Sequence, residues 1–515
     1  MSLRRTTGHG VMWSGLGFLG QNLITFAFSI VTARLLGPEV FGIMGLAIIV
    51  ITVGSLMADS GTQAALVHRD HDLDEAVNTA LISVPLAGLG ACALGVLAAP
   101  LLAWFYGEPE LLGVTAALSG VLVVRSFGLV PDALLQRRFQ FKQRRAVVDP
   151  VAAVAGGLTA TVLALLGAGI WALVASWYAI TFVTSLGSWL LARYRPNLAL
   201  ASIQTWRELT RYGRHLLAAS TVQLAYGYID IVTIGKNLTP DHVGWYGAAS
   251  RVALLPVSGF THVAGQALFP AFSRIRDDMD RLRGGFLEAL RYLSMLTVPI
   301  CVALAAVAVP LIVVMFGDPW RPSGAVIAIM MAWAVPYSFF EVAGELFKSV
   351  GRPGLIFILT LVKFGAFFAF LAGIWIVGVV SLNLVAVGFA LAMIISTALA
   401  VPLLRRAAGV TVGMHWGALR PTAVGGVVSA AIVIPLVWLA LPGMEDWSHI
   451  AGVPLGPVAP LLAMGAVALA TGALFLAGVE LAARGTIREI AALGRSLAGR
   501  EAAPAEPPPG LPKTS

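Results

Sequence analysis

Residues 37–47 read GPEVFGIMGLA and residues 239–249 read TPDHVGWYGAA. Both stretches follow the pattern x-P-acid-x-x-G-x-x-G-x-A, at a constant offset of 202 positions. The same offset aligns two further pairs without a gap, Gln21 with Gln223 and Arg34 with Lys236. Several matches in one frame indicate that the chain contains an internal duplication, rather than chance recurrence of Pro and Gly at helix ends.

Around these two stretches the chain is apolar over lengths that suit a bilayer. A helix needs about 20 apolar residues to cross about 30 Å of hydrocarbon. Such runs lie near 11–36, 40–59, 76–103, 110–134, 147–167, 170–192, 212–235, 243–270, 290–316, 324–347, 355–376, 382–404, 421–441 and 457–482. The sequence therefore predicts an all-α integral membrane protein with about 14 transmembrane helices.

Six predicted helices separate the two copies of the repeat, which makes the two halves parallel repeats. The predicted parts are an N-lobe (1–192, helices 1–6), a cytoplasmic inter-lobe linker (193–211), a C-lobe (212–404, helices 7–12) and two additional helices (405–483). Residues 484–515 are rich in Ala and Pro and are predicted to form a disordered cytoplasmic tail.

Composition supports the membrane assignment. Hydrophobic residues make up 58% and charged residues 12% of the chain, and its mean hydropathy is +0.86, whereas soluble domains carry about 25% charged residues. If the N-terminus is cytoplasmic, 28 of the 34 Lys and Arg residues fall in inside segments and two, Lys236 and Arg321, fall outside. This asymmetry predicts a plasma (inner) membrane protein with both termini cytoplasmic, and it explains the basic charge without nucleic acid.

Motifs for nucleotide or metal chemistry are not indicated. Gly15, Gly17 and Gly20 spell G-x-G-x-x-G inside the first apolar helix, where helix packing is the better explanation. The chain has no phosphate-binding G-x-x-x-x-G-K-[ST] loop, its eight His residues lack metal-ligand spacing, and its two Cys residues form no CxxC. We therefore expect no cofactor, no metal and no catalytic residues, and any energy for transport would have to come from a gradient.

Cations inside predicted helices are the most informative residues, because a charge at the bilayer centre costs at least about 2.5–3.5 kcal/mol. Arg125, Arg251 and Lys363 are predicted to bind substrate by neutralising an anionic head group such as a pyrophosphate. The alternative is that these groups pair with intramembrane carboxylates, for example Lys363 with Glu341, and only hold the structure together.

Intramembrane acids are predicted to couple transport to H⁺ or Na⁺. Asp230 lies in the seventh predicted helix, while Glu341 and Glu345 are one turn apart in the tenth. Purely structural pairing is the alternative for all three. For Arg34 and Lys236, at helix ends, snorkelling to lipid head groups is the favoured interpretation.

Amides and aromatic rings are predicted to contact sugars, and packing explains the same residues as the alternative. We assign Gln21, Gln223 and Tyr226 to the substrate-binding group. Residues 136–148, QRRFQFKQRRAVV, mix basic residues with Phe and are interpreted as a helix that lies on anionic lipid.

Four phrases give the chain a family resemblance: TARLLGPEVFGIMGLA (32–47), LLQRRFQFKQRRAVVD (134–149), IDIVTIGKNLTPDHVGWYGAASRVALLPV (229–257) and ALFPAFSRIRDDMDRLR (267–283). With them the chain resembles bacterial polysaccharide transporters of the multidrug/oligosaccharidyl-lipid/polysaccharide exporter superfamily. The resemblance covers about 1–410. It implies two six-helix lobes in a V around a central cationic cavity, working by alternating access. Related lipid II flippases concentrate basic residues in the first two helices, where this chain has only Arg34.

The expected function is therefore that of a flippase. It would move a lipid-linked oligosaccharide, a surface polysaccharide repeat unit, from the inner to the outer leaflet, with membrane lipids, a polymerase and glycosyltransferases as partners. A small-molecule or multidrug cation-coupled antiporter is the alternative. A membrane enzyme acting on glycans is disfavoured because the longest predicted outer loop, 441–456, offers only Glu445, Asp446 and His449.

Overall fold

A computed structural model describes residues 3–59, 61–69, 72–138, 144–440, 449–450, 453–454 and 458–483. The regular secondary structure of this part of the chain is helical, apart from one two-residue antiparallel pair, β1 (His449–Ile450) with β2 (Val453–Pro454). The expected tail and most of the loop 441–456 lie outside the described residues. Ten helices among the described residues are long and apolar enough to cross a membrane. The protein is therefore a multi-pass membrane protein.

The chain forms two compact units. The first unit contains residues 1–251, 312–326 and 364–388, and the second contains residues 252–311, 327–363 and 389–515. The earlier helices are α1 (Leu3–Asp59), α2 (Thr62–His68), α3 (Leu73–Tyr106), α4 (Glu110–Arg137), η1 (Arg144–Val148), α6 (Asp149–Leu165), α7 (Ile170–Ala192), η2 (Leu198–Leu200) and α8 (Ile203–Asn237). The later helices are α9 (Pro240–Ile275), α10 (Met279–Phe316), η3 (Asp318–Trp320), α11 (Pro322–Ser349), α12 (Gly354–Val377), α13 (Leu382–Ala408), α14 (Val412–Pro435), η4 (Leu436–Ala440) and α15 (Val458–Ala482).

Helix α1 contains two of the predicted helices, joined at a bend. Gly37 has φ 78° and ψ 174°, a conformation that interrupts the helix and that glycine adopts without a steric penalty. Pro38 follows it and begins the second segment. At the repeat-equivalent place α8 ends at Asn237 and α9 begins at Pro240, where the fixed φ of proline suits the first helical position. The backbone therefore breaks at the same point of both repeats.

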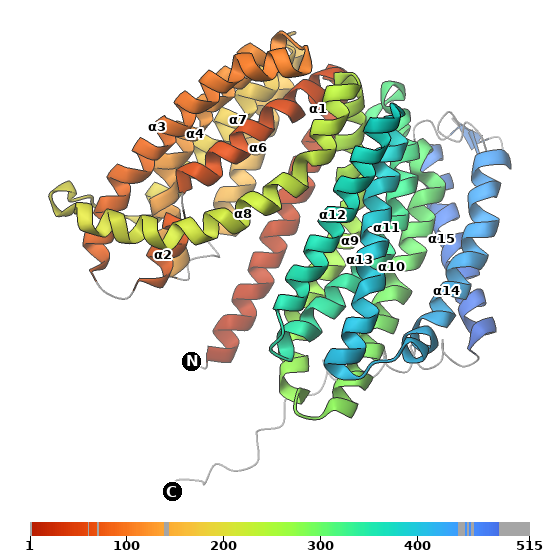
Figure 1. Ribbon diagram of the computed structural model, residues 1–515. Helices are drawn as coiled ribbons and strands as arrows, with labels where there is room; N and C mark the ends of the chain where they lie inside the picture. The colour runs from red at the N-terminus through yellow and green to blue at the C-terminus, as the bar shows by residue number, and fades with distance from the viewer. Residues whose placement is uncertain are drawn as a thin grey trace, which may run out of the picture. The chain divides into compact units, whose positions relative to one another are not determined.

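Small residues let the helices of the first unit pack closely. In Figure 1, α3, α4, α6 and α7 lie side by side, coloured orange to yellow. A Cβ atom added to Gly88 on α3 would meet Ser126 on α4, and one added to Gly128 on α4 would meet Ser185 on α7. Close backbone approach is how helices associate in lipid, where no hydrophobic force drives them together.

Helix α8 continues the inter-lobe linker directly into the seventh predicted span. At its start, the Thr205 hydroxyl donates to the Glu75 carboxylate, and Arg69 pairs with Glu208 at 2.9 Å. Leu209 is buried in a core cluster with residues of α3 and α4 such as Ala76. The linker is therefore docked on the first repeat.

The two helices after the second repeat pack in the second unit. Gly425 on α14 and Gly478 on α15 approach so closely that neither has room for a Cβ atom. Phe475 on α15 packs against Val298 of α10, and the Trp438 indole N–H donates to the Ala306 carbonyl at 3.0 Å. Both helices therefore lie against α10.

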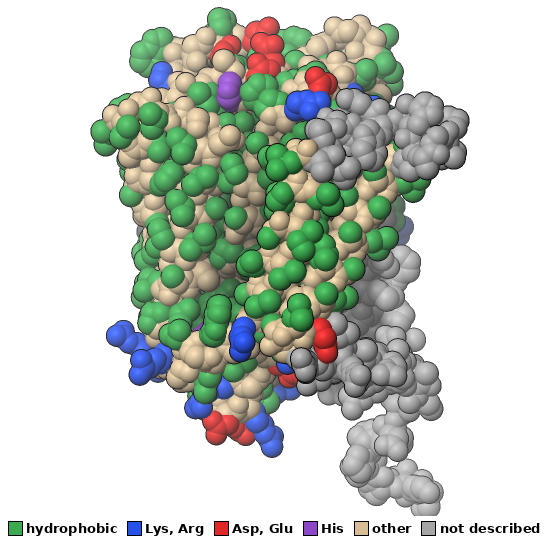
Figure 2. Space-filling view, turned by 90° about the vertical axis from the view of Figure 1, so that its right-hand side faces the viewer, with side chains coloured by type: hydrophobic (Ala, Val, Ile, Leu, Met, Phe, Trp, Pro, Cys, Tyr) green, Lys and Arg blue, Asp and Glu red, His purple; other side chains and the backbone are tan. Residues whose placement is uncertain are grey.

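The face shown in Figure 2 is covered largely by hydrophobic side chains, as a lipid-facing surface requires.

Candidate functional site

A buried carboxylate lies between α8 and α9 in the first unit. Asp230 is 8% exposed, and its Oδ2 accepts a hydrogen bond from the Tyr246 hydroxyl at 2.7 Å. The backbone N–H of Ile231 is 2.8 Å from its Oδ1. Burying an ionised carboxylate is costly unless donors compensate it. Gain or loss of a proton at Asp230 would therefore change its hydrogen bonds to Tyr246 and Ile231.

Tyr226 is one helical turn before Asp230 and close enough to interact with it electrostatically. Its ring packs against Phe364 and Phe367 of α12, with centroids 4.5 and 6.2 Å apart. The structure therefore brings together two of the predicted site residues, and Tyr226 also has the packing role of the alternative interpretation. Gln21 is half-buried on α1, without a hydrogen-bond partner in the part of the chain that the structure describes. The side chain of Gln223 lies outside the described residues.

Arg251 is a predicted substrate-binding cation on α9. Its side chain is exposed on α9, two turns into the predicted span, and forms no ion pair or hydrogen bond with another described residue. A guanidinium presents planar paired donors that match phosphate. The described residues therefore leave the Arg251 guanidinium unpaired.

Arg125 has a different environment. Its side chain on α4 is exposed, but it interacts electrostatically with Asp59 at the end of the second predicted span. The Asp59 carboxylate also accepts a hydrogen bond from the Gln63 backbone at 3.1 Å. Both original interpretations of Arg125 therefore remain open, since one exposed guanidinium can face a carboxylate and still bind a ligand.

In the second unit the predicted charges Glu341, Glu345 and Lys363 each have a partner of opposite charge. Glu345, 7% exposed, forms an ion pair with Lys348 at 2.7 Å. Glu341 and Lys363 interact electrostatically, and the ammonium of Lys363 stands 5.3 Å from the centroid of the Phe340 ring. These contacts are those of the structural alternative, because each charge already has a partner.

The two copies of the repeat motif touch each other within the first unit, and the contact is reciprocal. A Cβ atom on Gly42 would overlap the backbone carbonyl oxygen of Pro240. A Cβ atom on Gly244 would overlap the backbone carbonyl oxygen of Pro38. Since Pro38 aligns with Pro240 and Gly42 with Gly244, the contact has the form of a local two-fold relation. We call these four residues the repeat junction.

Arg34 and Lys236, which are equivalent in the repeat, show the same exchange. Arg34 donates from Nε to the carbonyl of Met315 at 2.8 Å and from its terminal nitrogen to the carbonyl of Val314, at the end of α10. Lys236 donates to the carbonyl of Phe105, at the end of α3, and lies 4.6 Å from the centroid of that ring. Each cation therefore caps the third predicted helix of the other repeat. The snorkelling interpretation, in which both side chains reach lipid head groups, did not include these protein carbonyl partners.

A polar cluster on α4 and η1 was missed by the sequence reasoning, which assigned 136–148 to a lipid surface. Asp132 accepts hydrogen bonds from Gln63 at 3.1 Å and from Arg144 at 2.6 Å, and Arg144 also pairs with Asp149. Arg137 donates to three carbonyl oxygens at the end of α2. The only available signal was the acid at Asp132 and Asp149 on either side of the basic run. Residues 139–143 lie outside the described set.

Comparison with protein families places these features in context. The model of a family described as "Polysaccharide biosynthesis protein" matches residues 31–325. The chain is 28% identical over 363 residues to the succinoglycan biosynthesis transport protein ExoT of Rhizobium meliloti (strain 1021), covering 70% of this chain and 72% of that protein. It is 26% identical over 412 residues to the lipopolysaccharide biosynthesis protein WzxC of Escherichia coli (strain K12), covering 78% of this chain and 81% of that protein.

Solved structures with a similar fold belong to transporters. The lipid II flippase MurJ in an inward closed conformation superposes with a TM-score of 0.67 at 12% identity, covering 90% of this chain and 98% of that chain. An inward-facing multidrug transporter of the MATE family gives a TM-score of 0.58 at 17% identity, covering 75% of this chain and 94% of that chain. At these identities the likeness establishes the fold alone.

Proposed function

Because the chain belongs to the polysaccharide biosynthesis protein family, we propose that it is a flippase for a lipid-linked oligosaccharide. It moves the saccharide head group from the inner to the outer leaflet and makes or breaks no covalent bond. The proposal draws support from relatives named as transport and biosynthesis proteins for succinoglycan and lipopolysaccharide, each aligned over more than two thirds of this chain.

One structural observation carries the substrate assignment. Arg251 is an exposed guanidinium in a segment that is otherwise suited to the membrane, and it is not paired with another described side chain. Holding such a group in a membrane is costly, so a function has to offset the cost. A phosphate or pyrophosphate linking lipid to sugar is an anion that a guanidinium can bind through two parallel hydrogen bonds. Arg125 is proposed as a second contact to the same head group, and Gln21, Gln223 and Tyr226 as contacts to its first sugars.

The proposed arrangement is fourteen membrane helices in the inner membrane, with both termini cytoplasmic and helices 1–6 and 7–12 as two lobes. The lipid-linked saccharide enters from the cytoplasmic side while the lipid tail stays in the bilayer. The lobes then rock, and the head group is released outside. A polymerase and glycosyltransferases are the proposed partners before and after this step.

The repeat junction is proposed to close the outer end of the pathway. The loops that bear it contain few cations, which by the positive-inside rule places them outside. Gly42 and Gly244 give the two repeats room to touch, and Arg34 and Lys236 add a polar contact on each side. For the head group to leave, these contacts must separate.

Coupling is proposed to use the buried carboxylate of Asp230, with H⁺ as the simplest ion. Protonation removes its charge and changes the hydrogen bond from Tyr246. Glu341 and Glu345 are weaker candidates because Lys363 and Lys348 already balance them. The same buried acid favours a cation-coupled small-molecule antiporter as the second candidate function.

Purified protein in vesicles with a fluorescent lipid-linked saccharide in the lumenal and outer leaflets tests the main proposal. A membrane-impermeant quencher reports the fraction in each leaflet over time. We expect Arg251→Ala to slow exchange about 10- to 100-fold, because a charge-assisted hydrogen bond is worth about 1.5–3 kcal/mol. Arg321→Ala is the matched control, since Arg321 is a surface cation bonded to its neighbour Asp318.

The two candidate functions give different results in this assay. If the wild-type protein leaves the leaflet distribution of the saccharide unchanged but exchanges a cationic dye against protons, the antiporter is correct and the flippase proposal fails. If Arg251→Ala and Arg321→Ala exchange the saccharide at the wild-type rate, transport does not use the proposed guanidinium and the substrate assignment fails.

A further inference from the structure

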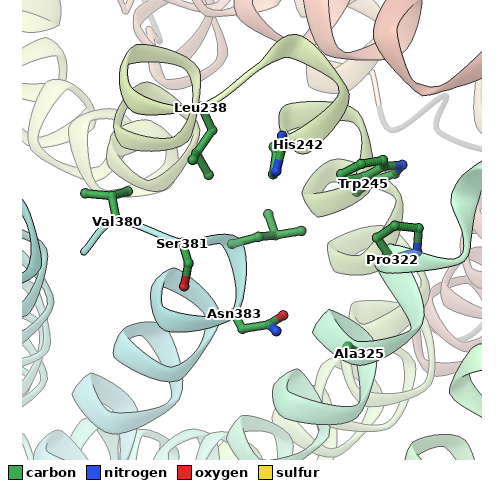
Figure 3. A pocket seen from close by; sticks show the side chains of 9 residues that line it. Leu238, His242, Trp245, Pro322, Ala325, Val380, Ser381 and Asn383 are labelled. Carbon is green, nitrogen blue, oxygen red and sulfur yellow. The ribbon is translucent and has the colours of Figure 1, made fainter. Parts of the chain in front are cut away.

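A cavity of about 370 Å³ lies at the first turns of α9, α11 and α13. Its lining comes from the junction of α8 and α9, the start of α11 and the start of α13, and every lining residue belongs to the first unit. In Figure 3, Leu238 and His242 lie on one side of the cavity, Ser381 and Asn383 lie opposite, and Trp245 and Pro322 close one end. The volume is within the range of about 300–1,000 Å³ that is typical of small-molecule sites.

The lining is polar but carries no formal charge. It contains no Asp, Glu, Lys or Arg, and its polar groups are the side chains of His242, Trp245, Ser381 and Asn383. Burial lowers the pKa of His242, which precedes the span predicted over 243–270, and the adjacent Asp241 acts in the opposite direction. The imidazole is therefore neutral at pH 7. No lining group is suited to neutralising an ion.

Two of the side chains are held in place by the protein. The Trp245 indole N–H donates to the Pro319 carbonyl at 2.9 Å, and the ring meets His242 edge-on with centroids 4.8 Å apart. Nδ1 of His242 is 2.8 Å from the Thr239 hydroxyl, which leaves Nε2 for another partner. A ring fixed in this way offers apolar surface to a ligand at little cost in side-chain entropy.

Asn383 is a further polar group of the cavity that can bind a ligand. Its side chain is exposed and makes no hydrogen bond to another described residue. An amide offers two donors and one acceptor, which matches a ligand that both donates and accepts. The negative end of α8 and the positive ends of α9, α11 and α13 all lie at the cavity, so the helix dipoles do not select one sign of charge. The lining also has no charged side chain to balance an ionic ligand.

We propose that this pocket binds a neutral sugar residue, with the sugar ring against Trp245 and hydroxyl groups on Asn383. A pyranose ring combines an apolar C–H surface with a rim of hydroxyl groups, which is the chemistry that the pocket offers. On the proposed topology the pocket opens on the outer side, so it receives a sugar of the head group after translocation. In this respect the inference rests on the proposed function.

Saturation-transfer NMR tests the inference, with the full chain in lipid nanodiscs and methyl β-D-glucopyranoside and methyl α-D-galactopyranoside as probes. Sugar-based detergents are excluded because their head groups would compete. We expect saturation of ring protons at millimolar probe and an approximately fivefold weaker Kd in Asn383→Ala, since one neutral hydrogen bond is worth about 1 kcal/mol. Trp245→Phe keeps an apolar ring and is expected to weaken binding less than Trp245→Ala.

Two control variants are available close by. Asn237→Ala removes an exposed amide that bonds its own helix outside the lining, and Trp375→Phe changes an exposed indole elsewhere. Both are expected to bind as the wild type does. The site is overturned if neither probe receives saturation transfer. It is also overturned if Asn383→Ala and Asn237→Ala show equal saturation transfer. Stronger transfer to methyl glucuronide than to the neutral probes overturns the ligand class.

The vesicle assay separates failure of the pocket from failure of the proposed function. If the protein leaves the leaflet distribution of the lipid-linked saccharide unchanged while probe binding is weakened in Asn383→Ala, the flippase proposal fails and the sugar pocket stands. If the wild-type protein exchanges the saccharide but binds neither probe, the pocket inference fails and the flippase stands.

Discussion

A Cβ atom on Gly42 would overlap the backbone carbonyl oxygen of Pro240, which follows it by 198 positions in the chain. The repeat-equivalent residues, Gly244 and Pro38, meet in the same way. A glycine at each place is therefore required by a backbone atom of the other repeat. Backbone cannot rotate aside as a flexible side chain can, so the constraint is a stringent one.

Gly42→Ala and Gly244→Ala are each expected to destabilise this contact by about 1–3 kcal/mol, the usual cost of overpacking. Thermal unfolding of the purified variants measures the loss. The equivalent glycines of the next turn are the controls, because Gly45 has only the side chain of Val243 at 3.4 Å and Gly247 has open space. Gly45→Ala and Gly247→Ala are expected to match or exceed wild-type stability, since alanine favours helix. Equal effects at all four positions would contradict the role of the repeat junction.

Removing Arg34 or Lys236 is expected to loosen the same end of the first unit. Each cation binds carbonyl oxygens at the end of a helix, an interaction worth about 0.3–1 kcal/mol at an exposed site. Arg34→Met and Lys236→Met keep an apolar stem and lose the charge. The measurement is the rate at which a membrane-impermeant thiol reagent labels a cysteine placed at Ala33. Ala33 is fully buried, and its carbonyl accepts a hydrogen bond from the Trp320 indole.

We expect either substitution to raise that labelling rate about two- to fivefold, following the loss of about 0.3–1 kcal/mol. The background protein carries Cys92→Ser and Cys301→Ala, so that only the introduced thiol reacts. Arg352→Met is the control, because Arg352 is an exposed cation that belongs to the second unit. If Arg34→Met and Lys236→Met are labelled as slowly as Arg352→Met, the two cations do not stabilise the contacts around Ala33.

Hydropathy alone was sufficient to predict the helical membrane fold. Lipid forces each crossing segment to satisfy its own backbone, so about 20 apolar residues in a row have few alternatives to a helix. The bend in α1 could also be predicted from the sequence, because Gly37 and Pro38 separate two apolar runs. What hydropathy could not give was the continuity of α8, because a polar linker and an apolar span can share one helix.

The candidate site was predicted less completely. The sequence identified Asp230, because an acid in an apolar run is conspicuous, but its donor Tyr246 lies on the next helix and carries no such signal. It aligned Arg34 with Lys236 but could not supply their partners, since backbone carbonyl groups at helix ends have no signature in the sequence. Contacts between side chain and distant backbone are thus the part that only three-dimensional structure provides.

Tyr246→Phe is expected to cost about 1–3 kcal/mol, because it leaves the buried carboxylate of Asp230 without its hydroxyl donor. In an Asp230→Leu background the same change is expected to be nearly neutral, since both polar partners are then absent. Chemical denaturation of the four proteins of this double-mutant cycle measures the coupling. Tyr178→Phe, which removes a donor to the neutral Ala117 carbonyl, provides a comparison of about 1 kcal/mol. Equal costs of Tyr246→Phe in both backgrounds would show that the hydroxyl acts independently of Asp230.

Arg144→Gln tests whether the basic segment 136–148 belongs to the folded protein or to a lipid surface. The Arg144 side chain is 16% exposed and pairs with Asp132 and with Asp149, whose side chain is 6% exposed. Removing one member of such a buried pair typically costs about 3–5 kcal/mol. We therefore expect a large fall in thermal stability in nanodiscs of neutral lipid. Arg276→Gln is the control, because Arg276 and its partner Asp277 are 61% and 95% exposed and surface pairs are worth about 0–1 kcal/mol. If Arg144→Gln is stable in neutral lipid and differs from wild type only in binding anionic lipid, the lipid-surface interpretation is correct.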